Sequence, residues 1–197
     1  MSFLKTVAED EAVGEVADMY ELDIERLGDL PNYSKTFSLH PAAYRAWRGL
    51  IASIAKPMDE RRYELATFGA ANRLRSTYCS LAHGQILVDK FLEPSVVEDL
   101  VEDPASAGLD QVETLIVQFG AKVAEDATTI TESDIDRLRS AGLSDRDIFD
   151  VVLAAAARCF FSKVLDATGT LADAGYNEME PALREALTVG RPIAREI

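Results

Sequence analysis

Helical periodicity runs through almost the whole chain, and it constrains the fold more than any other feature of the sequence. Apolar residues recur at three- and four-residue intervals, and no stretch alternates between apolar and polar residues for long, as a half-buried strand would. In residues 41–56 such an apolar stripe consists of Tyr44, Trp47, Leu50, Ile51 and Ile54. The sequence therefore predicts an all-α fold, a single-domain multi-helix bundle.

Prolines, glycines and capping residues indicate where the helices begin and end. Pro41 and Pro94 suit the first turn of a helix, Asp59 and Ser144 are good N-caps, and Gly169 ends a helix. Segment 30–40 is expected to be a connector with one helical turn. The expected helices span residues 9–27, 41–56, 60–75, 77–91, 94–103, 112–124, 131–142, 145–169 and 180–187.

The length of the chain predicts one domain. At 197 residues and 21.6 kDa it can bury a sizeable core, and it is short for two domains. We expect a single domain over residues 1–197, with a motif core at 59–91 and a C-terminal tail over 176–197.

Composition excludes several classes of partner. The net charge of -14 argues against binding to nucleic acid, because phosphate contacts need clustered Lys and Arg. No apolar run approaches the ~20 residues that a membrane span requires, and no basic amphipathic stretch suggests a membrane surface. The N-terminus lacks the apolar core of a signal peptide. The only two cysteines lie 80 residues apart (positions 79 and 159), too few for a disulfide framework, so we expect a reducing cytoplasmic location.

A candidate site lies within residues 64–83. Cys79 and His83 are four residues apart, so their side chains meet on one face of a helix. Ser76 is expected to cap this helix, which places Cys79 in its first turn, where the positive end of the helix dipole favours thiolate over thiol. Glu64 lies on the preceding helix, in a segment that is small and apolar nearly all round, and a buried carboxylate must be paired or hydrogen-bonded.

Each of these residues also has a purely structural interpretation. Ser76 serves only as a cap in that interpretation, Tyr78 belongs to the core rather than donating a proton, and Glu64 pairs with Arg61 or Arg73. The remaining His and Cys are both interpreted as structural: His40 as a cap or surface group, and Cys159 as an inert packing residue. The convergence of thiol, histidine and carboxylate favours a functional site.

The spacing of the site resembles that of the alkylhydroperoxidase D and carboxymuconolactone decarboxylase superfamily. Its thiol-peroxidase members carry the pattern Glu-x11-Cys-x2-Cys-x3-His. This chain reads Glu64-x11-Ser76-x2-Cys79-x3-His83, in register at every position, with serine in place of the first cysteine.

Two flanking segments extend the resemblance over residues 12–175. The stretch LPNYSKTFSLHPAAYRAW (30–47) is similar to the entry segment of the "peroxidase-related" branch, which contains Pro-Asn and His-Pro. The stretch FFSKVLDATG (160–169) resembles the late helix of that branch, with Ser162-Lys163 in place of its Asn-Arg. The resemblance implies an alkylhydroperoxidase D-like helical bundle that assembles as a homo-oligomer, a dimer, trimer or hexamer.

The resemblance also implies an activity and its residues. Cys79 is the cysteine that attacks the peroxide, and Glu64 and His83 align with the groups that relay its proton. The partners would be an organic hydroperoxide and an external thiol reductant, with no cofactor and no metal. A zinc site of Glu64, Cys79 and His83 is disfavoured, since a helix N-terminus is a poor place for a cation.

Three hypotheses for function remain open at this stage. In the first, the protein is a one-cysteine peroxidase whose Cys79 sulfenic acid is resolved by an external thiol or by Cys159. In the second, Glu64, His83 and Tyr78 perform non-redox acid–base chemistry of the decarboxylase type. In the third, the protein is a non-catalytic oligomeric binding protein of the same fold.

Overall fold

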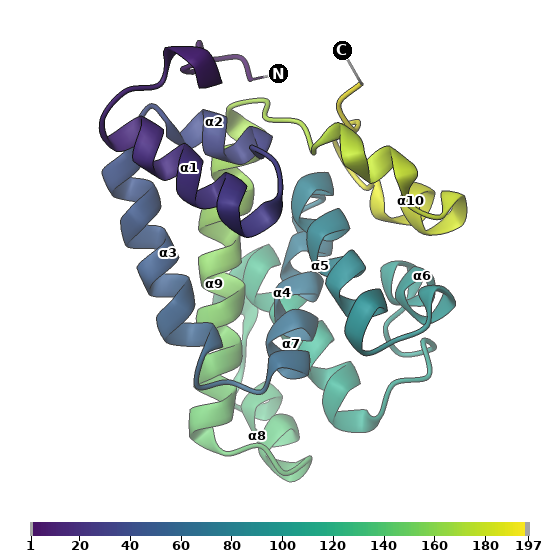
Figure 1. The fold of residues 1–197 in the computed structure, drawn as a ribbon. Coiled ribbons are helices and arrows are strands. Elements are labelled where there is room, and N and C mark those ends of the chain that lie inside the picture. Colours follow the sequence, from purple (N-terminus) through teal and green to yellow (C-terminus); the bar gives the residue numbers. More distant parts are fainter. Residues whose placement is uncertain (1, 196–197) are drawn as a thin grey trace.

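The centre of the molecule is α4 (Glu60–Arg73), which packs against α5 (Thr77–Lys90), α7 (Gln111–Asp126) and α9 (Asp145–Ala167) (Figure 1). The structure is a computed structural model that describes residues 2–195. The 23-residue α9 contacts α3, α4, α5, α7 and α8, so this largely apolar helix also lies at the centre.

The other elements surround this centre. Figure 1 shows α1, α2 and α3 on one side of α9, α6 and α10 beyond α5, and α8 at the lower end. Their bounds are α1 (Glu15–Leu27), α2 (Asn32–Phe37), α3 (Pro41–Ala55), α6 (Pro94–Glu102), α8 (Glu132–Ser140) and α10 (Pro181–Leu187), with short 3-10 helices at Glu9–Glu11, Ala127–Thr129 and Ala174–Glu178.

Two glycines allow α4 and α7 to approach each other closely. A Cβ atom on Gly69 would lie 2.3 Å from the carbonyl oxygen of Val117, and one on Gly120 would lie 2.5 Å from that of Ala66. Both distances are below van der Waals contact, so only glycine fits at either position. This close contact buries the middle of α4, the helix that carries Glu64.

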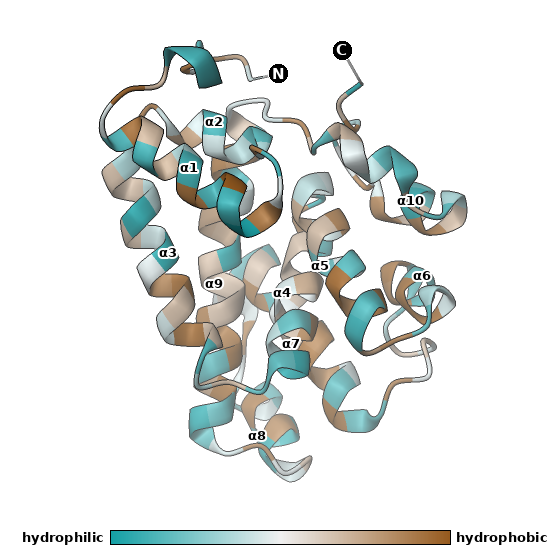
Figure 2. Ribbon diagram, in the orientation of Figure 1, coloured by the Kyte–Doolittle hydropathy of each residue, from teal (hydrophilic) through white to brown (hydrophobic). Residues whose placement is uncertain are grey.

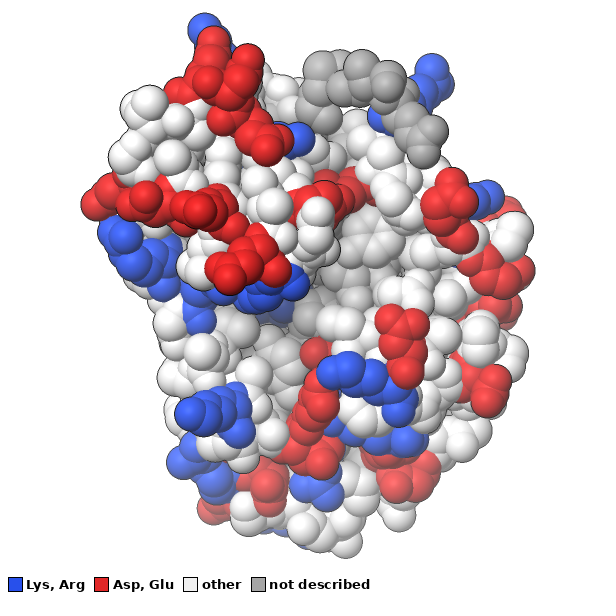
Figure 3. Space-filling view, viewed as in Figure 1, with Lys and Arg blue, Asp and Glu red and all other residues white. Residues whose placement is uncertain are grey.

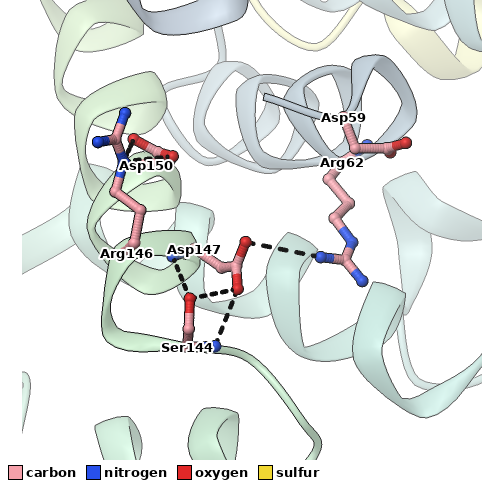
Figure 4. A network of polar contacts seen from close by, with 6 residues as sticks. All are labelled: Asp59, Arg62, Ser144, Arg146, Asp147 and Asp150. Carbon is pink, nitrogen blue, oxygen red and sulfur yellow. Dashed lines mark hydrogen bonds and ion pairs between the residues drawn. The ribbon is translucent and has the colours of Figure 1, made fainter. Parts of the chain in front are cut away.

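Side-chain caps fix the starts of α4 and α9, the helices that flank the site (Figure 4). The Asp59 carboxylate accepts a hydrogen bond of 3.0 Å from the backbone N–H of Arg62. Ser144 and Asp147 form a reciprocal capping box, in which each side chain accepts from the other residue's backbone N–H. Arg62 also pairs with Asp147 at 3.9 Å, which joins the two helix starts.

The outer helices mix hydrophilic and hydrophobic residues along their length, as amphipathic helices do (Figure 2). Acidic side chains gather along α1, and the same face of the molecule is hollowed between α1 and α5 (Figure 3). None of the helices within residues 2–195 combines the length and the apolarity needed to cross a membrane.

The all-α prediction is confirmed, and most helix ends agree within two residues, but the N-terminal quarter differs from expectation. Residues 9–27 do not form one helix, because Gly14 has a left-handed φ of 56° and separates a short 3-10 helix from α1. Val13 beside it is 79% exposed, so no burial of apolar surface favours a continuous helix. The connector 30–40 contains the six-residue α2. Leu50, expected in the buried stripe of α3, is 49% exposed.

Candidate active site

The inner face of α5 is polar although it is buried. Ser76, Cys79, Ser80 and His83 recur at helical spacing on this face, and all four are less than 9% exposed. Cys79 itself is only 1% exposed. A row of buried polar side chains is costly unless their groups are paired, so the residues opposite α5 decide what this face can do.

The partner of the Cys79 sulfur is Arg158, a residue that the sequence analysis did not select. Its Nη1 donates a hydrogen bond of 3.6 Å to Sγ, and the side chain is 4% exposed. Burial disfavours the charge of Arg158, but Cys79, Tyr63 and Glu64 face it, and the net effect raises the pKa of its guanidinium. A guanidinium fixed against the sulfur stabilises the negative charge of a thiolate.

His83 and Glu64 form a second buried pair in the same site. Nδ1 of His83 lies 2.5 Å from Oε2 of Glu64. Burial lowers the pKa of His83 below its usual value; the Arg158 guanidinium lowers it further, whereas Glu64 acts in the opposite direction. The imidazole is therefore neutral at pH 7, with its proton on Nδ1 donated to the carboxylate and the lone pair on Nε2.

The structural interpretation of Glu64 as a partner of Arg61 or Arg73 is wrong. Arg61 pairs with Glu113 through Nε and Oε1 at 2.5 Å, and Arg73 pairs with Glu125. Glu64 is thus left to His83. No hydrogen bond joins His83 to Cys79, so the predicted thiol, histidine and carboxylate lie in one cluster without a direct thiol–imidazole hydrogen bond.

The Tyr78 hydroxyl belongs to a network that joins distant parts of the chain. It donates to the carboxylate of Asp173 and accepts from the backbone N–H of Tyr33 at 3.4 Å, while Asp173 also accepts from the backbone of Asn32 at 2.7 Å. Burial, followed by the charge of Asp173, raises the pKa of Tyr78 well above its usual value. Its proton is engaged by Asp173, which agrees with the interpretation of Tyr78 as a core residue.

Ser76 occupies the N-cap position of α5, but its side chain does not cap the helix. The chain enters this position through Arg75, which has a left-handed φ of 56°. The Ser76 hydroxyl is fully buried and faces the carboxyl of Asp166, and this contact lowers the pKa of that carboxyl, against the larger effect of burial. The C-terminal tail covers this end of α5, where the N–H of Gly190 donates to Thr77 Oγ1 at 2.8 Å.

The remaining His and Cys have structural surroundings. His40 caps α3, since its Nδ1 accepts from the backbone N–H of Ala43 at 3.2 Å. Cys159 is half-buried in a small separate cluster with Ala70, Ala124 and Ala155, and burial raises the pKa of its thiol. Cys159 therefore does not belong to the Cys79 cluster.

The sequence analysis did not select Arg158, because residues 148–161 around it are mostly apolar. The signal was present in the run AAAARCFF, where a single cation interrupts a buried helix and needs a partner. Asp173 was missed for another reason, because nothing in the sequence indicates that the tail returns to Tyr78.

In this site the Cys79 thiol accepts a hydrogen bond from the Arg158 guanidinium, and the neutral imidazole of His83 lies on the same helix face. Within residues 2–195 no group of three or more His, Cys, Asp or Glu side chains is arranged to hold a metal ion. We refer to Cys79, Arg158, His83 and Glu64 as the thiol site. These four groups suit attack by sulfur on an electrophile, with proton transfer through the imidazole.

Comparison with known proteins identifies the fold. No family model and no curated protein matches the sequence. Among solved structures, the alkylhydroperoxidase AhpD core of an uncharacterized peroxidase-related protein from Ralstonia eutropha JMP134 superposes with a TM-score of 0.78 at 17% identity, over 96% of this chain and 98% of that one. An uncharacterized peroxidase-related protein from Silicibacter sp. TM1040 gives 0.75 at 23% identity, over 89% and 91%.

A third neighbour has a different named activity. The debrominase Bmp8, as a cysteine-to-alanine variant in complex with 2,3,4-tribromopyrrole, gives a TM-score of 0.71 at 16% identity, over 93% of this chain and 95% of that one. These identities establish shape rather than activity. The resemblance seen in the sequence is confirmed at the level of the fold, and the chain has the all-α fold of the alkylhydroperoxidase AhpD core.

Proposed function

We propose that this protein is a thiol-dependent peroxidase that reduces organic hydroperoxides through Cys79. The observation that carries the proposal is the hydrogen bond of 3.6 Å from the buried Arg158 to the Cys79 sulfur. Among the two cysteines, Cys79 alone has such a partner, whereas Cys159 lies in an alanine cluster. The neutral His83, held by Glu64, supplies the base that a thiol peroxidase needs.

The first step is attack of the Cys79 thiolate on one oxygen of the hydroperoxide. The S–O bond forms, the O–O bond breaks, sulfur is oxidised to the sulfenic acid, and the alkoxide leaves with a proton as the alcohol. Arg158 holds the attacking sulfur as thiolate. Nε2 of His83 accepts a proton and returns it to the leaving oxygen, while Glu64 keeps the imidazole in the required tautomer.

The second step needs a thiol that the chain does not supply at position 76. An external thiol attacks the sulfenic acid, releases water and forms a mixed disulfide, and a second thiol then frees Cys79. Such reductants belong to a reducing cytoplasm, which is the compartment we propose.

The aromatic residues around the site favour an organic substrate. Arg158 stacks over the ring of Phe161 at 5.6 Å, and Trp47 stacks on the same ring at 4.1 Å. An apolar group on the hydroperoxide would find this surface beside the thiol site. Since Cys79 is 1% exposed, side chains around it must move when the substrate enters.

Mass spectrometry after a stoichiometric dose of cumene hydroperoxide, with a sulfenic-acid trap and peptide mapping, tests the proposal. We expect an adduct at Cys79 in the wild type and in Cys159→Ser, and none in Cys79→Ser. An unmodified Cys79 at doses that oxidise free cysteine would refute the proposal. A parallel sample with 2,3,4-tribromopyrrole tests the compound that is bound in the debrominase neighbour.

The acid–base alternative is favoured by one observation, the His83–Glu64 pair, which is complete without the thiol. It would give an activity that survives Cys79→Ser and is lost in Glu64→Gln. The peroxidase proposal instead requires that Cys79→Ser abolishes the activity. A protein that turns over in neither form would be a binding protein of this fold.

A further inference from the structure

Two buried polar atoms on one side of α9, Arg158 Nε and Ser162 Oγ, have no hydrogen-bond partner within residues 2–195. On the side of α5, the hydroxyl of Ser76 faces the carboxyl of Asp166 and no other protein group in the described part of the chain. Ser76 and Ser162 are 0% exposed and Arg158 is 4% exposed. More than about 90% of buried polar groups in native proteins are paired, with protein or with water, so the two unpaired atoms of α9 need an explanation.

The positions of these residues define a continuous row. On α9, Arg158, Ser162 and Asp166 follow one another at intervals of four residues, so they share one side of the helix. Two contacts fix how this row meets α5: Arg158 bonds to Cys79, and Asp166 faces Ser76. Ser162 therefore lies between the two contacts, and we call these five residues the α5–α9 seam.

Bound water satisfies the unpaired atoms of the seam best. Leaving a buried hydroxyl or N–H unpaired costs about 1–3 kcal/mol, and buried waters typically bridge two to four such groups. Each unpaired atom here is a hydroxyl or a guanidinium N–H, the groups that bind water.

The outer end of the seam reaches the protein surface. Asp166 is only partly buried, and burial raises the pKa of its carboxyl, while Ser76 and Arg191 act in the opposite direction. The Arg191 guanidinium donates to the backbone carbonyl of Asp166 at 2.8 Å and so fixes this end of α9 under the tail. A titratable group thus stands where the seam meets solvent.

The proposed reaction gives such a seam a task. In that reaction Cys79 attacks as a thiolate and brings no proton to the leaving oxygen. His83 can pass on only a proton that reaches the site, so the leaving alkoxide depends on a proton from solvent, and Cys79 is 1% exposed, without a direct route to it. On α5, His83 lies one turn after Cys79, and the seam runs from Cys79 in the opposite direction, toward Ser76 at the start of the helix.

We propose that the α5–α9 seam is a hydrated proton path, in which water bound to Ser162 and Ser76 connects Cys79 to Asp166. This inference rests on the proposed peroxidase function for the reaction that it serves. As the O–O bond breaks, a proton passes along the bound water to the alkoxide, and Asp166 replaces it from solvent. No oxidation state changes along the path. Ser162 acts here as a positioning residue, and Asp166 exchanges protons with solvent.

Two rates measured on the same variants separate a proton path from a structural role. The variants are Ser162→Ala and Asp166→Asn, with Asp150→Asn as the matched control, because Asp150 lies on the same helix and pairs with Arg146. Oxidation of Cys79 by one equivalent of cumene hydroperoxide requires a delivered proton, whereas alkylation by iodoacetamide does not. Both are followed by intact mass in single-turnover experiments.

We expect oxidation to slow about tenfold in both seam variants, below the roughly 10²–10⁴-fold effect of losing a general acid, because His83 remains. Alkylation should stay within about twofold of wild type, and Asp150→Asn should change neither rate. A high-resolution crystal structure should show ordered water between Ser162 and Ser76.

The outcomes also distinguish the path from the peroxidase itself. If the wild type is oxidised at Cys79 and both seam variants react at the wild-type rate, the path is overturned and the peroxidase stands. If oxidation and alkylation slow equally, the residues are structural and the path is again overturned. If the wild type is alkylated but never oxidised, the peroxidase proposal fails and the path fails with it.

Discussion

Replacement of Arg158 by methionine tests the electrostatic basis of the thiol site. Methionine keeps much of the length and apolar volume of the side chain and removes the charge. In the wild type the guanidinium is 4% exposed and donates to Cys79 Sγ at 3.6 Å. Without it, negative charge on the buried sulfur loses the cation that donates a hydrogen bond to it.

The expected loss follows from the strength of this contact. A hydrogen bond to a charged group contributes about 1.5–3 kcal/mol, so its loss makes the negatively charged, attacking form of the sulfur less stable by a factor of roughly 10 to 150. The full attraction between two unit charges about 4 Å apart, roughly 4 kcal/mol at an effective dielectric constant near 20, sets the upper limit. Since only the thiolate is nucleophilic, the rate of reaction should fall by the same factor.

Alkylation by iodoacetamide at pH 7, followed by intact mass, measures this rate without any assumption about the natural substrate. Arg158→Met should react roughly 10- to 150-fold more slowly than the wild type. Arg158→Lys keeps the charge but loses the planar fork, so its rate should lie between the two. Cys159→Ser provides the background in which Cys79 is the only thiol.

A folded Arg158→Met variant that is alkylated within about twofold of the wild-type rate would refute this reasoning. Thermal unfolding of each variant shows whether it is folded. If the methionine variant does not fold, the comparison of Arg158→Lys with the wild type still tests the planar geometry of the guanidinium. Equal alkylation rates in those two proteins would show that only the positive charge matters.

Three further predictions concern stability. Burial lowers the pKa of His83, so below about pH 6.5 the unfolded chain binds a proton at His83 before the folded protein does. The free energy of unfolding should therefore fall with decreasing pH, by up to about 1.4 kcal/mol per pH unit, until the lowered pKa is reached. In urea denaturation at several pH values, His83→Gln should lack this contribution to the slope. Gly69→Ala should lower the free energy of unfolding by about 2–3 kcal/mol in the same assay, since its Cβ would overlap the Val117 carbonyl. The control Gly49→Ala, with open space around it, should stabilise α3 by about 0.5–1 kcal/mol. A Gly69→Ala variant as stable as the wild type would contradict the close contact. Asp23→Ala should destabilise by about 3 kcal/mol, because the fully buried carboxylate accepts hydrogen bonds from three side chains, and a loss below about 1 kcal/mol would show that water replaces them.

Helix type and position could be predicted because the signals for them are local. Asp59 and Ser144 cap α4 and α9 as expected from their own sequence neighbourhoods. The break at Gly14 was not predicted, since apolar residues continue across it at near-helical spacing, and a single left-handed φ interrupts them.

The site could be predicted only in part, because its pairing is non-local. The spacing of Cys79 and His83 shows that they share a helix face, and the structure adds Glu64 from the preceding helix as expected. Arg158 is 79 residues away in sequence from its sulfur partner, and no spacing rule connects two positions on separate helices at that distance. Ser76 does not act as a side-chain cap for a similarly non-local reason, because its hydroxyl faces the carboxyl of Asp166 on α9.

The tail that covers the start of α5 also imposes an order of events during synthesis. Gly190 fits so tightly that a Cβ atom there would lie 2.0 Å from the Arg75 carbonyl, and its N–H bonds to Thr77, 113 residues earlier. At about 5–20 residues per second, the ribosome needs roughly 6–20 s to make that stretch. A new chain lacks Arg158 for the first part of this interval, since Arg158 follows Cys79 by 79 residues, and it lacks the covering tail for all of it. The thiol therefore acquires its mature environment only near the end of translation.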